Sequence, residues 1–259
     1  MYRGGTYRTF EVTDSQNRVW KVMSDSSVRT TNGGDQCEFV TPILRYTADM
    51  EQLQEIVRAL YKAGGRANPS CGLHVHVGAR GFSAATLRNL ANIVYSKQDL
   101  LYKAIGVEDN ADRIRYCKKL QQGFIARINA KPPKTVEEFG RQWYLDFGGL
   151  EQNRNIHYSN GRYFCVNFHA FYSKGTIEFR CFSSTLHAGY VRTYVILSIA
   201  IINQALNQRC ARPKITETDN PAFTFRTWLL RMGMIGDLYE TPRKLLLKNF
   251  DGSKAWRYR

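Results

Sequence analysis

The chain has 259 residues, of which 43% are hydrophobic and 23% are charged, so it is long enough to bury a sizeable core as one large domain or two. It carries 37 Lys and Arg residues against 22 Asp and Glu, a formal net charge of +15. Such a surface attracts polyanions, and it also suits a phosphate-bearing cofactor or an acidic substrate. The basic residues are spread along the chain without a helix-turn-helix, zinc-finger or RNP signature, so nucleic-acid binding is an alternative and not the favoured function.

Targeting signals are not evident in the sequence. No stretch approaches the ~18 consecutive apolar residues of a membrane span, and the opening "MYRGGTYRTFEV" lacks the apolar core of a signal peptide. The most apolar run, Tyr194 to Leu206, is interpreted as a buried helix because it contains Ser198, Asn203 and Gln204. The six cysteines are scattered without a Cys-x-x-Cys pair, which indicates reduced thiols, so we expect a cytoplasmic protein with no membrane partner.

The first elements predicted are strands. "TYRTFEV" and "RVWKVM" flank the polar "TDSQN" as a hairpin, and "CEFVTPIL" is a short strand ended by Pro42. Met50 to Ala63 carries apolar residues at helical spacing, which predicts an amphipathic helix that Gly64 and Gly65 end.

The middle of the chain mixes one strand with several helices. "CGLHVHVG" is a short apolar strand, and Ser83 is an N-cap candidate for the long apolar helix that follows. Arg113 to Ile128 is predicted to be helical. Thr135 and Glu138 have capping-box spacing for a helix near Glu137 to Leu145, and "GGLEQNRNIHYSNG" is predicted to be a loop.

Two further strands and a helical end complete the predicted fold. The strands "RYFCVNFHAF" and "GTIEFRCFSS" are joined by the turn "YSKG", Tyr190 to Asn207 is a buried helix, and "TDNPAFTFRTWLLRMG" predicts another. Antiparallel-looking strands alternate with helices that can cover only one sheet face, so we predict an α+β fold. The prediction is one domain over residues 1–259, with a helical C-terminal part over about 187–259.

Three of these strands pair an apolar face with a polar one. Side chains alternate between the faces of a strand, so His74 and His76 share the face opposite Leu73, Val75 and Val77. The same alternation gives the polar faces of the two later strands, which are Thr176, Glu178 and Arg180 in one and Cys165, Asn167 and His169 in the other.

A solvated sheet face is the simplest alternative for any one of these strands, and a Glu-x-Arg pair can be a surface ion pair worth ~0–1 kcal/mol. Together, the three strands favour a polar site. A carboxylate with an imidazole suits Mg²⁺ or Mn²⁺ on nucleotide phosphates, and Arg180 can hold a phosphate. No Gly-x-x-x-x-Gly-Lys-[Ser/Thr] loop is present, so ATP would be held differently from P-loop enzymes. A zinc hydrolase built on His74, His76 and Glu178 is a further alternative.

The elements, in this order, resemble the putative amidoligase family, which belongs with glutamine synthetase and glutamate–cysteine ligase to the carboxylate–amine ligase superfamily. The resemblance runs from about Tyr7 to the end of the chain, and its most specific part is "CGLHVHV" followed later by "TIEFRCF". The other matching stretches are "WKVMSDSS", "EFVTPIL", "LRNLANIVYSKQDLLYKA", "RYFCVNFHAF", "KGTIEFRCFSSTLHAG" and "FRTWLLRMGMIGD".

The resemblance implies a glutamine-synthetase-like fold, in which a curved antiparallel sheet forms a half-open funnel backed by helices. ATP and Mg²⁺ (or Mn²⁺) would bind in the funnel. A substrate carboxylate would attack the γ-phosphate to give an acyl phosphate, and an amine would then displace phosphate to leave an amide or isopeptide bond. The implied substrates are a carboxylate and an amine from amino acids, peptides or proteins. The alternative is a non-catalytic module on the same fold that binds nucleic acid or an acidic partner.

The resemblance also implies roles for individual residues. The catalytic residues would be His74, Glu178 and Arg180. The metal ligands would be His74, Glu178 and Glu38, and the nucleotide contacts would be Arg180, His76, Arg162 and Asn167. Asp25, Ser26 and Ser27 of "SDSS" would bind substrate, with a simple polar turn as the alternative.

The N-terminal region departs from the family pattern. Family members usually begin with a strand of the type Gly-x-Glu-x-Glu, whose two acids supply metal ligands. Nothing in this sequence matches that strand, and the only early acid on a predicted strand is Glu11. A site without those carboxylates should bind metal weakly, so we expect impaired activity.

Overall fold

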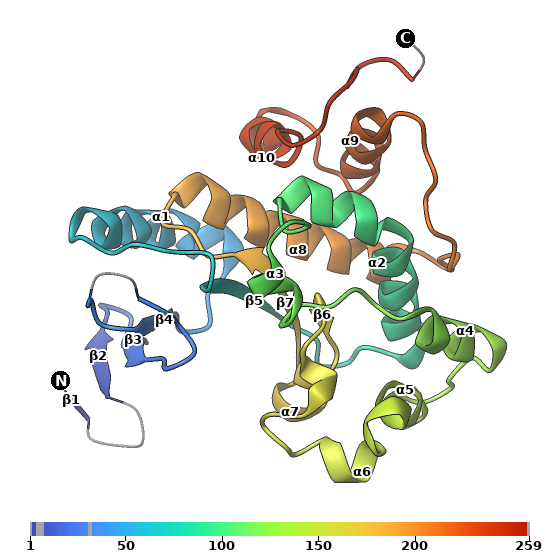
Figure 1. Ribbon diagram of the computed structural model, residues 1–259, viewed down its shortest axis with the longest axis horizontal. Coiled ribbons are helices and arrows are strands. Elements are labelled where there is room, and N and C mark those ends of the chain that lie inside the picture. Colours follow the sequence, from blue (N-terminus) through green and yellow to red (C-terminus); the bar gives the residue numbers. More distant parts are fainter. Residues whose placement is uncertain (1, 4–7, 31–32, 258–259) are drawn as a thin grey trace. The chain divides into compact units, whose positions relative to one another are not determined.

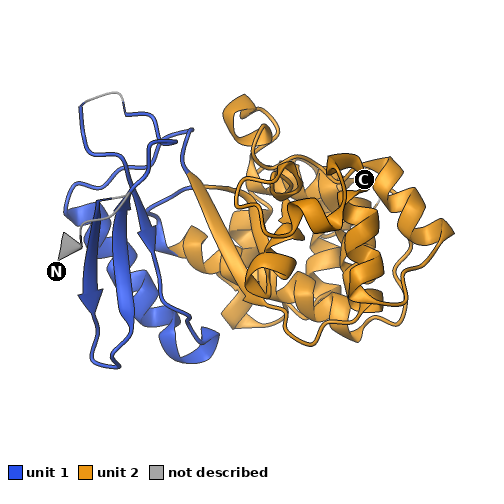
Figure 2. Cartoon of the chain, turned by 90° about the horizontal axis from the view of Figure 1, so that it is seen from below, with its two compact units in different colours: residues 1–71, 184–188 blue, residues 72–183, 189–259 orange. Residues whose placement is uncertain are grey.

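The computed structural model describes residues 2–3, 8–30 and 33–257 (Figure 1). The chain divides into two compact units, unit 1 with residues 1–71 and 184–188 and unit 2 with residues 72–183 and 189–259 (Figure 2). Each unit contains one antiparallel sheet of the described strands. The predicted α+β class is therefore confirmed, whereas a single funnel-shaped sheet is not confirmed. The prediction of one domain stays a prediction.

Unit 1 contains a four-stranded sheet and one helix. The strands β1 (Tyr2–Arg3), β2 (Thr9–Thr13), β3 (Val19–Ser24) and β4 (Cys37–Val40) pair in chain order. The predicted hairpin and the third strand are confirmed, although Thr6 and Tyr7 of the predicted first strand lie outside the described residues. Helix α1 (Tyr46–Lys62) begins earlier than its predicted start.

Polar contacts tie the hairpin of unit 1 to α1. Arg18 forms ion pairs with Asp14 at 2.9 Å and with Asp49 of α1 at 2.8 Å. The indole of the buried Trp20 donates a hydrogen bond to Asp14 and stacks on Phe39 of β4, with the ring centroids 5.8 Å apart. These contacts connect β3, β4 and the turn between β2 and β3 with the helix.

The sheet of unit 2 has β7 (Thr176–Ser183) at its centre, between β5 (Gly72–Gly78) and β6 (Val166–Asn167). The strands predicted for β5 and β7 are confirmed. The predicted strand "RYFCVNFHAF" is wrong over most of its length, because β6 has only two residues and helix α7 (His169–Lys174) follows it. His169 therefore lies on a helix and not on the sheet face predicted for it.

Two long helices supply much of the core of unit 2. Helix α2 (Ala84–Ile105) begins as predicted, with the Ser83 hydroxyl accepting a hydrogen bond from the backbone of Thr86. Helix α8 (Ala188–Asn207) packs on β7, where Tyr194 stacks on Phe182 with centroids 4.3 Å apart.

Helix α8 is long and apolar enough to cross a membrane by length and composition alone. In this protein, 56% of its most apolar window is buried inside the fold. That burial is the pattern of a core helix, as the sequence predicts for this segment.

The segment predicted as one helix from Arg113 to Ile128 is instead two helices, α3 (Ala111–Ile114) and α4 (Gln122–Ala130). Between them, the backbone of Lys118 pairs with the chain around Phe164, with two hydrogen bonds of 2.9 Å. This tertiary pairing outweighs the local helical preference of the segment.

The remaining helices of unit 2 are α5 (Val136–Tyr144), α6 (Leu150–Asn153), α9 (Pro221–Arg231) and α10 (Glu240–Leu246), with short 3-10 helices at Leu145–Phe147, Asn160–Arg162 and Asp237–Tyr239. One of the two hydrogen bonds of the capping box predicted for α5 is present. Thr135 accepts a hydrogen bond from the backbone of Glu138, whereas the Glu138 carboxylate accepts from the backbone of Lys134.

Candidate active site

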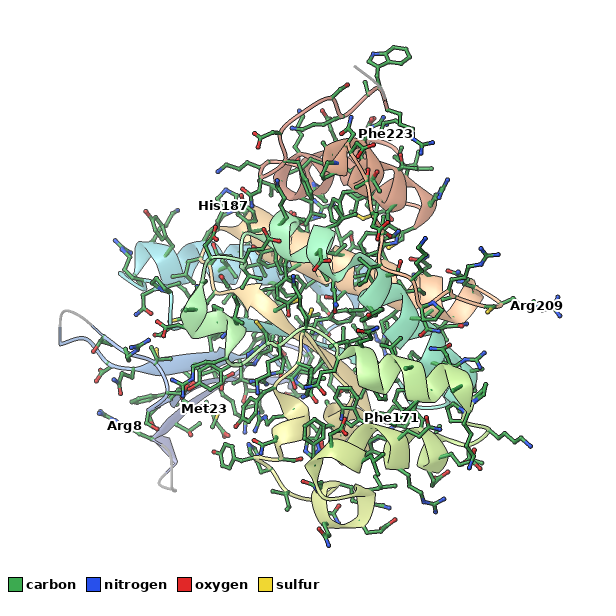
Figure 3. The ribbon with its side chains drawn as sticks, turned by 45° about the vertical axis from the view of Figure 1, so that its right-hand side comes forward. Arg8, Met23, Phe171, His187, Arg209 and Phe223 are labelled. Atoms are coloured by element: carbon green, nitrogen blue, oxygen red, sulfur yellow. The ribbon has the colours of Figure 1, made fainter. Side chains whose placement is uncertain are left out.

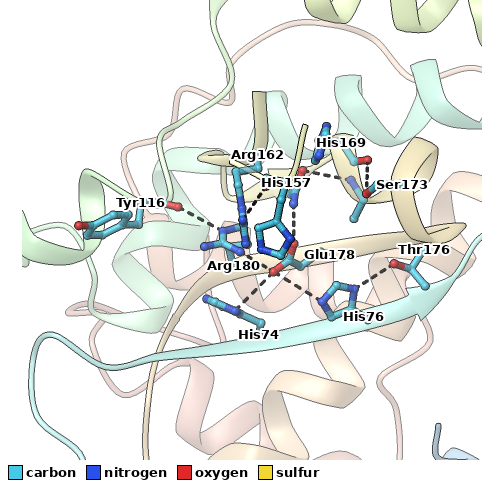
Figure 4. Close-up of polar contacts among 12 residues, drawn as sticks. His74, His76, Tyr116, His157, Arg162, His169, Ser173, Thr176, Glu178 and Arg180 are labelled. Atoms are coloured by element: carbon cyan, nitrogen blue, oxygen red, sulfur yellow. Dashed lines mark hydrogen bonds and ion pairs between the residues drawn. The ribbon is translucent and has the colours of Figure 1, made fainter. Parts of the chain in front are cut away.

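The polar cluster of unit 2 is centred on Glu178, in the middle strand of the sheet (Figure 4). The strand register places His76 of β5 opposite Glu178 on one side and Asn167 of β6 opposite it on the other. Residues directly opposite in antiparallel strands have adjacent side chains. The Asn167 amide accordingly donates to Glu178 Oε2 at 2.5 Å.

Both histidines of β5 face the same carboxylate. The register shifts between Leu73 and Val75, so His74 lies at a β-bulge, a feature that re-aims side chains. His74 Nδ1 is 3.4 Å and His76 Nε2 is 3.6 Å from Glu178 Oε1. The other nitrogen of His76, Nδ1, lies 2.9 Å from the hydroxyl of Thr176, which fixes the orientation of that ring.

Arg180 is the cation closest to Glu178. Its Nη1 donates to Glu178 Oε1 at 2.6 Å, and both side chains are buried. Nη2 of the buried Arg113 donates to the Arg180 carbonyl at 2.6 Å. A Cβ at Gly72 would lie 2.5 Å from Arg113 Nη1, so this start of β5 requires glycine if the guanidinium is to keep its place.

A second layer of aromatic and basic side chains surrounds the Glu178 cluster. Arg162 donates to the carbonyl of His157 at 2.7 Å, and its guanidinium lies over the rings of Tyr158 and Tyr163. His169 Nδ1 is 2.5 Å from the Tyr144 hydroxyl. These groups form a basic, hydrogen-bonded rim.

Burial and the basic neighbours set the charges in the cluster. Burial alone would raise the pKa of Glu178, but Arg180, the two imidazoles and the Asn167 hydrogen bond lower it to about 2. Burial, and then the charge of Arg180, lower the pKa of His74 to about 3, and burial also lowers the pKa of His76. At pH 7 the carboxylate is therefore ionised and both imidazoles are neutral.

A family model described as putative amidoligase enzyme matches residues 3–202, which is well over half of the chain. The chain belongs to this family. The match ends before α9, so the predicted resemblance of "FRTWLLRMGMIGD" lies outside the matched range. Neither the search of curated proteins nor that of solved structures found a match.

In this amidoligase family member, the structure brings together five predicted site residues, namely His74, His76, Asn167, Glu178 and Arg180, with Arg162 at the rim. Their side chains come from three strands and one short 3-10 helix. The catalytic, metal-binding and nucleotide-binding roles stay predictions.

Four other predicted site residues belong to unit 1. Glu38 lies on β4, and Asp25, Ser26 and Ser27 form the turn after β3. Asp25 Oδ1 accepts hydrogen bonds from the Ser27 backbone at 2.9 Å and from the Ser27 hydroxyl at 2.7 Å. This geometry is that of the polar turn named as the alternative. The metal role of Glu38 and the substrate role of the turn stay predictions.

Several residues of the amidoligase cluster were missed as candidates. Thr176 shares the polar face of β7, so alternation could have added it. Arg113 and the Tyr116 carbonyl, 3.5 Å from Arg180 Nε, come from a separate segment and gave no signal in the sequence. Lys174 acts on His76 and His169 through its charge, and no sequence pattern marked it as a candidate.

The residues of the cluster can be compared with the ATP and divalent metal that the resemblance predicts. Positive charges from Arg180, Arg162 and Lys174 suit phosphates. His74 Nε2 is enclosed and has no hydrogen-bond partner, so it offers a lone pair to a metal when Nδ1 carries the proton toward Glu178. Within the described ranges, no group of three or more His, Cys, Asp and Glu could hold a metal, so phosphate oxygens and water would complete the coordination. The zinc alternative gains no support.

The depressed pKa values predict a protein that becomes less stable in acid. The unfolded chain binds a proton on His74 near pH 6.5, whereas the folded protein binds it only near pH 3. Stability is therefore fully present above pH 6.5 and falls on acidification, by at most about 1.4 kcal/mol per pH unit for this group. Glu178 adds to the loss between pH 4.5 and 2.

Urea unfolding at several pH values between 7 and 5 measures this slope. His74→Gln should reduce the slope of unfolding free energy against pH by the contribution of about one proton. Part of the slope should remain, because burial also lowers the pKa of His76 and His169. An unaltered slope in His74→Gln would contradict the assignment.

Proposed function

We propose that this protein is an ATP-dependent carboxylate–amine ligase that forms an amide or isopeptide bond through an acyl phosphate. Membership of the amidoligase family supports a ligase-type function. The observation that carries the finer proposal is that His74, His76 and Arg180 all lie against the same carboxylate oxygen, Glu178 Oε1, on one sheet.

The basic side chains would hold the phosphates. Arg180 uses one nitrogen on Glu178 and retains further N–H groups, while Arg162 lies near enough for its charge to affect Arg180 and Glu178. Burial lowers the pKa of Arg162, which indicates that its guanidinium is partly withdrawn from water. Fixed cations of this kind stabilise the charge that develops during phosphoryl transfer.

Glu178 and His74 would hold the divalent ion, which when bound neutralises phosphate charge. Asn167 and Arg180 engage both oxygens of Glu178 and so fix the orientation of the carboxylate. The cluster depends on one carboxylate, so we expect weak metal binding and slow turnover.

In the proposed reaction, an oxygen of the substrate carboxylate bonds to the γ-phosphorus of ATP. The bond between that phosphorus and the β–γ bridging oxygen breaks, and ADP leaves. The amine nitrogen then bonds to the acyl carbon, phosphate departs with the bonding electrons, and the nitrogen loses a proton. The neutral state of both imidazoles at pH 7 avoids adding an acidic proton beside the acyl phosphate.

Release of ADP in the presence of Mg²⁺ or Mn²⁺ and mixtures of amino acids or peptides tests this function. Glu178→Gln keeps the size of the side chain and removes its charge, so it should abolish ADP release. Asp99→Asn on α2 alters an exposed ion pair with Lys119, so this variant is the matched control and should keep full activity.

Two outcomes would contradict the proposal. One is ADP release in Glu178→Gln equal to that of the unaltered protein. The other is no turnover in the unaltered protein together with salt-dependent binding of DNA or RNA, which would favour the non-catalytic alternative. Circular dichroism of the variants separates loss of chemistry from loss of folding.

A further inference from the structure

A cavity of about 790 Å³ lies in unit 2 and shares no lining residue with the Glu178 cluster. Its walls come from α2, the C-terminal end of α8, the connection over residues 208–220, α9 and Arg257. Figure 3 shows Phe223 on α9 and Arg209 on the connection that leaves α8. Apart from the α2 residues, the lining lies beyond the part of the chain that the family model matches.

The charged side chains lining this cavity are mainly basic. They are Lys97, Arg212, Arg231 and Arg257, against Glu217 and Asp219. Lys97 is half-buried, and its ammonium donates to the Thr216 hydroxyl at 2.5 Å. Over the described part of the chain, no carboxylate forms an ion pair with Lys97 or with Arg231. The half-buried Lys97 and the exposed Arg231 thus line the cavity together, and neither has a described carboxylate within ion-pair distance.

The charge of Arg231 acts directly on Lys97. Burial, followed by the nearby Arg231, lowers the pKa of Lys97. Holding a half-buried ammonium near a second positive charge costs free energy unless an anion neutralises it. A bound anion would remove that cost, so the arrangement favours an anionic ligand.

The walls are ordered by their own hydrogen bonds. Thr216 is bonded to Ser96 of α2 through its backbone at 3.0 Å. The indole of the buried Trp228 donates to Gln204 at 2.9 Å, and Gln204 donates to Gln208. These bonds connect α2, α8, α9 and the connection, so the cavity is pre-formed, as small-molecule sites usually are.

We propose that this cavity binds a small organic anion, with a phosphate or carboxylate group of the ligand held between Lys97 and Arg231. Arginine provides paired donors for such groups and lysine a compact charge. The volume lies within the range of about 300–1,000 Å³ that is usual for small-molecule sites. A small molecule that fits within this volume suits the site better than a nucleic acid, which would need an extended surface. The proposal is independent of the ligase function.

Isothermal titration calorimetry at constant ionic strength tests the proposal, with pyrophosphate as the phosphate probe and citrate as the carboxylate probe. The unaltered protein should bind at least one of them, and the difference between the probes identifies the preferred head group. Lys97→Met and Arg231→Gln should each weaken that binding about tenfold or more. Lys214→Met is the control, because this exposed lysine lies on the same connection but outside the cavity lining. The Lys214→Met variant should bind the probe as the unaltered protein does.

Glu178→Gln separates this cavity from the ligase site and should bind the probe as the unaltered protein does. Thermal unfolding without ligand confirms that each variant is folded. The expected result for Lys97→Met is an unchanged or raised melting temperature, because a half-buried ammonium is removed. The proposal is overturned if neither probe binds, if Lys97→Met binds with full affinity, or if binding is lost in Glu178→Gln alone.

Discussion

Glu178→Ala is expected to lower the free energy of unfolding by about 3–5 kcal/mol, the usual cost of removing one partner of a buried ion pair. Glu178 and Arg180 are both about 5% exposed, and their charged atoms are 2.6 Å apart. Without the carboxylate, the guanidinium would stay buried with its charge uncompensated. The Asn167 amide would also lose its acceptor.

A double-mutant cycle separates the charge effect from simple loss of volume. Adding Arg180→Leu to Glu178→Ala removes the stranded cation, so the double variant should be more stable than Glu178→Ala alone. Urea denaturation at pH 7 measures all four proteins. The exposed pair of Asp99 and Lys119 is the reference, where Asp99→Ala should cost no more than about 1 kcal/mol. A similarly small loss in Glu178→Ala would show that the pair is effectively solvated.

The centre of the candidate site could be predicted because it depends on strand alternation. A period of two places His74 with His76 and Glu178 with Arg180, whatever the order of the strands. The structure adds what alternation cannot supply, namely that β7 lies between β5 and β6 and that His76 pairs with Glu178. Register depends on hydrogen-bonding partners far apart in the sequence, and a single sequence does not encode these as a local pattern.

The errors arose where tertiary contacts outweigh local preference. "RYFCVNFHAF" is rich in aromatic residues that favour strands, yet the chain turns into α7 after Asn167, whose Oδ1 accepts a hydrogen bond from the backbone of Ala170. Arg113 also shows this limit. It lies in a short helix predicted as part of a longer one, and only the fold brings it to the Arg180 carbonyl.

The sequence also did not show to which sheet each strand belongs. The resemblance implied one curved sheet, whereas the described strands form two sheets, one in each unit. Glu38 was grouped with His74 and Glu178 because the resemblance implied a shared metal site, and its metal role stays a prediction. A carboxylate on a strand is a metal-ligand candidate by chemistry, but its partners are set by sheet topology.

Trp143→Ala is expected to destabilise unit 2 by about 3–5 kcal/mol, because it removes a large buried ring that the surrounding side chains cannot replace. Trp143 of α5 is 2% exposed and packs edge-on against Phe124, Phe164 and Phe168, with centroids 4.8, 4.9 and 5.1 Å away. Phe164 and Phe168 flank β6, the strand that carries Asn167 to Glu178. The cavity left by alanine should therefore loosen the support of the candidate site as well as the core.

Trp143→Phe is the matched variant for this test. The indole nitrogen of Trp143 is buried without a hydrogen-bond partner, so phenylalanine keeps most of the packing and removes an unsatisfied polar group. Its cost should be below about 1.5 kcal/mol, and Trp256→Ala, at a residue 62% exposed, should change stability by no more than about 0.5 kcal/mol. Urea unfolding of the three variants ranks them. If Trp143→Ala and Trp256→Ala lose equal stability, the aromatic cluster is not a core and the support it gives to Asn167 must come from elsewhere.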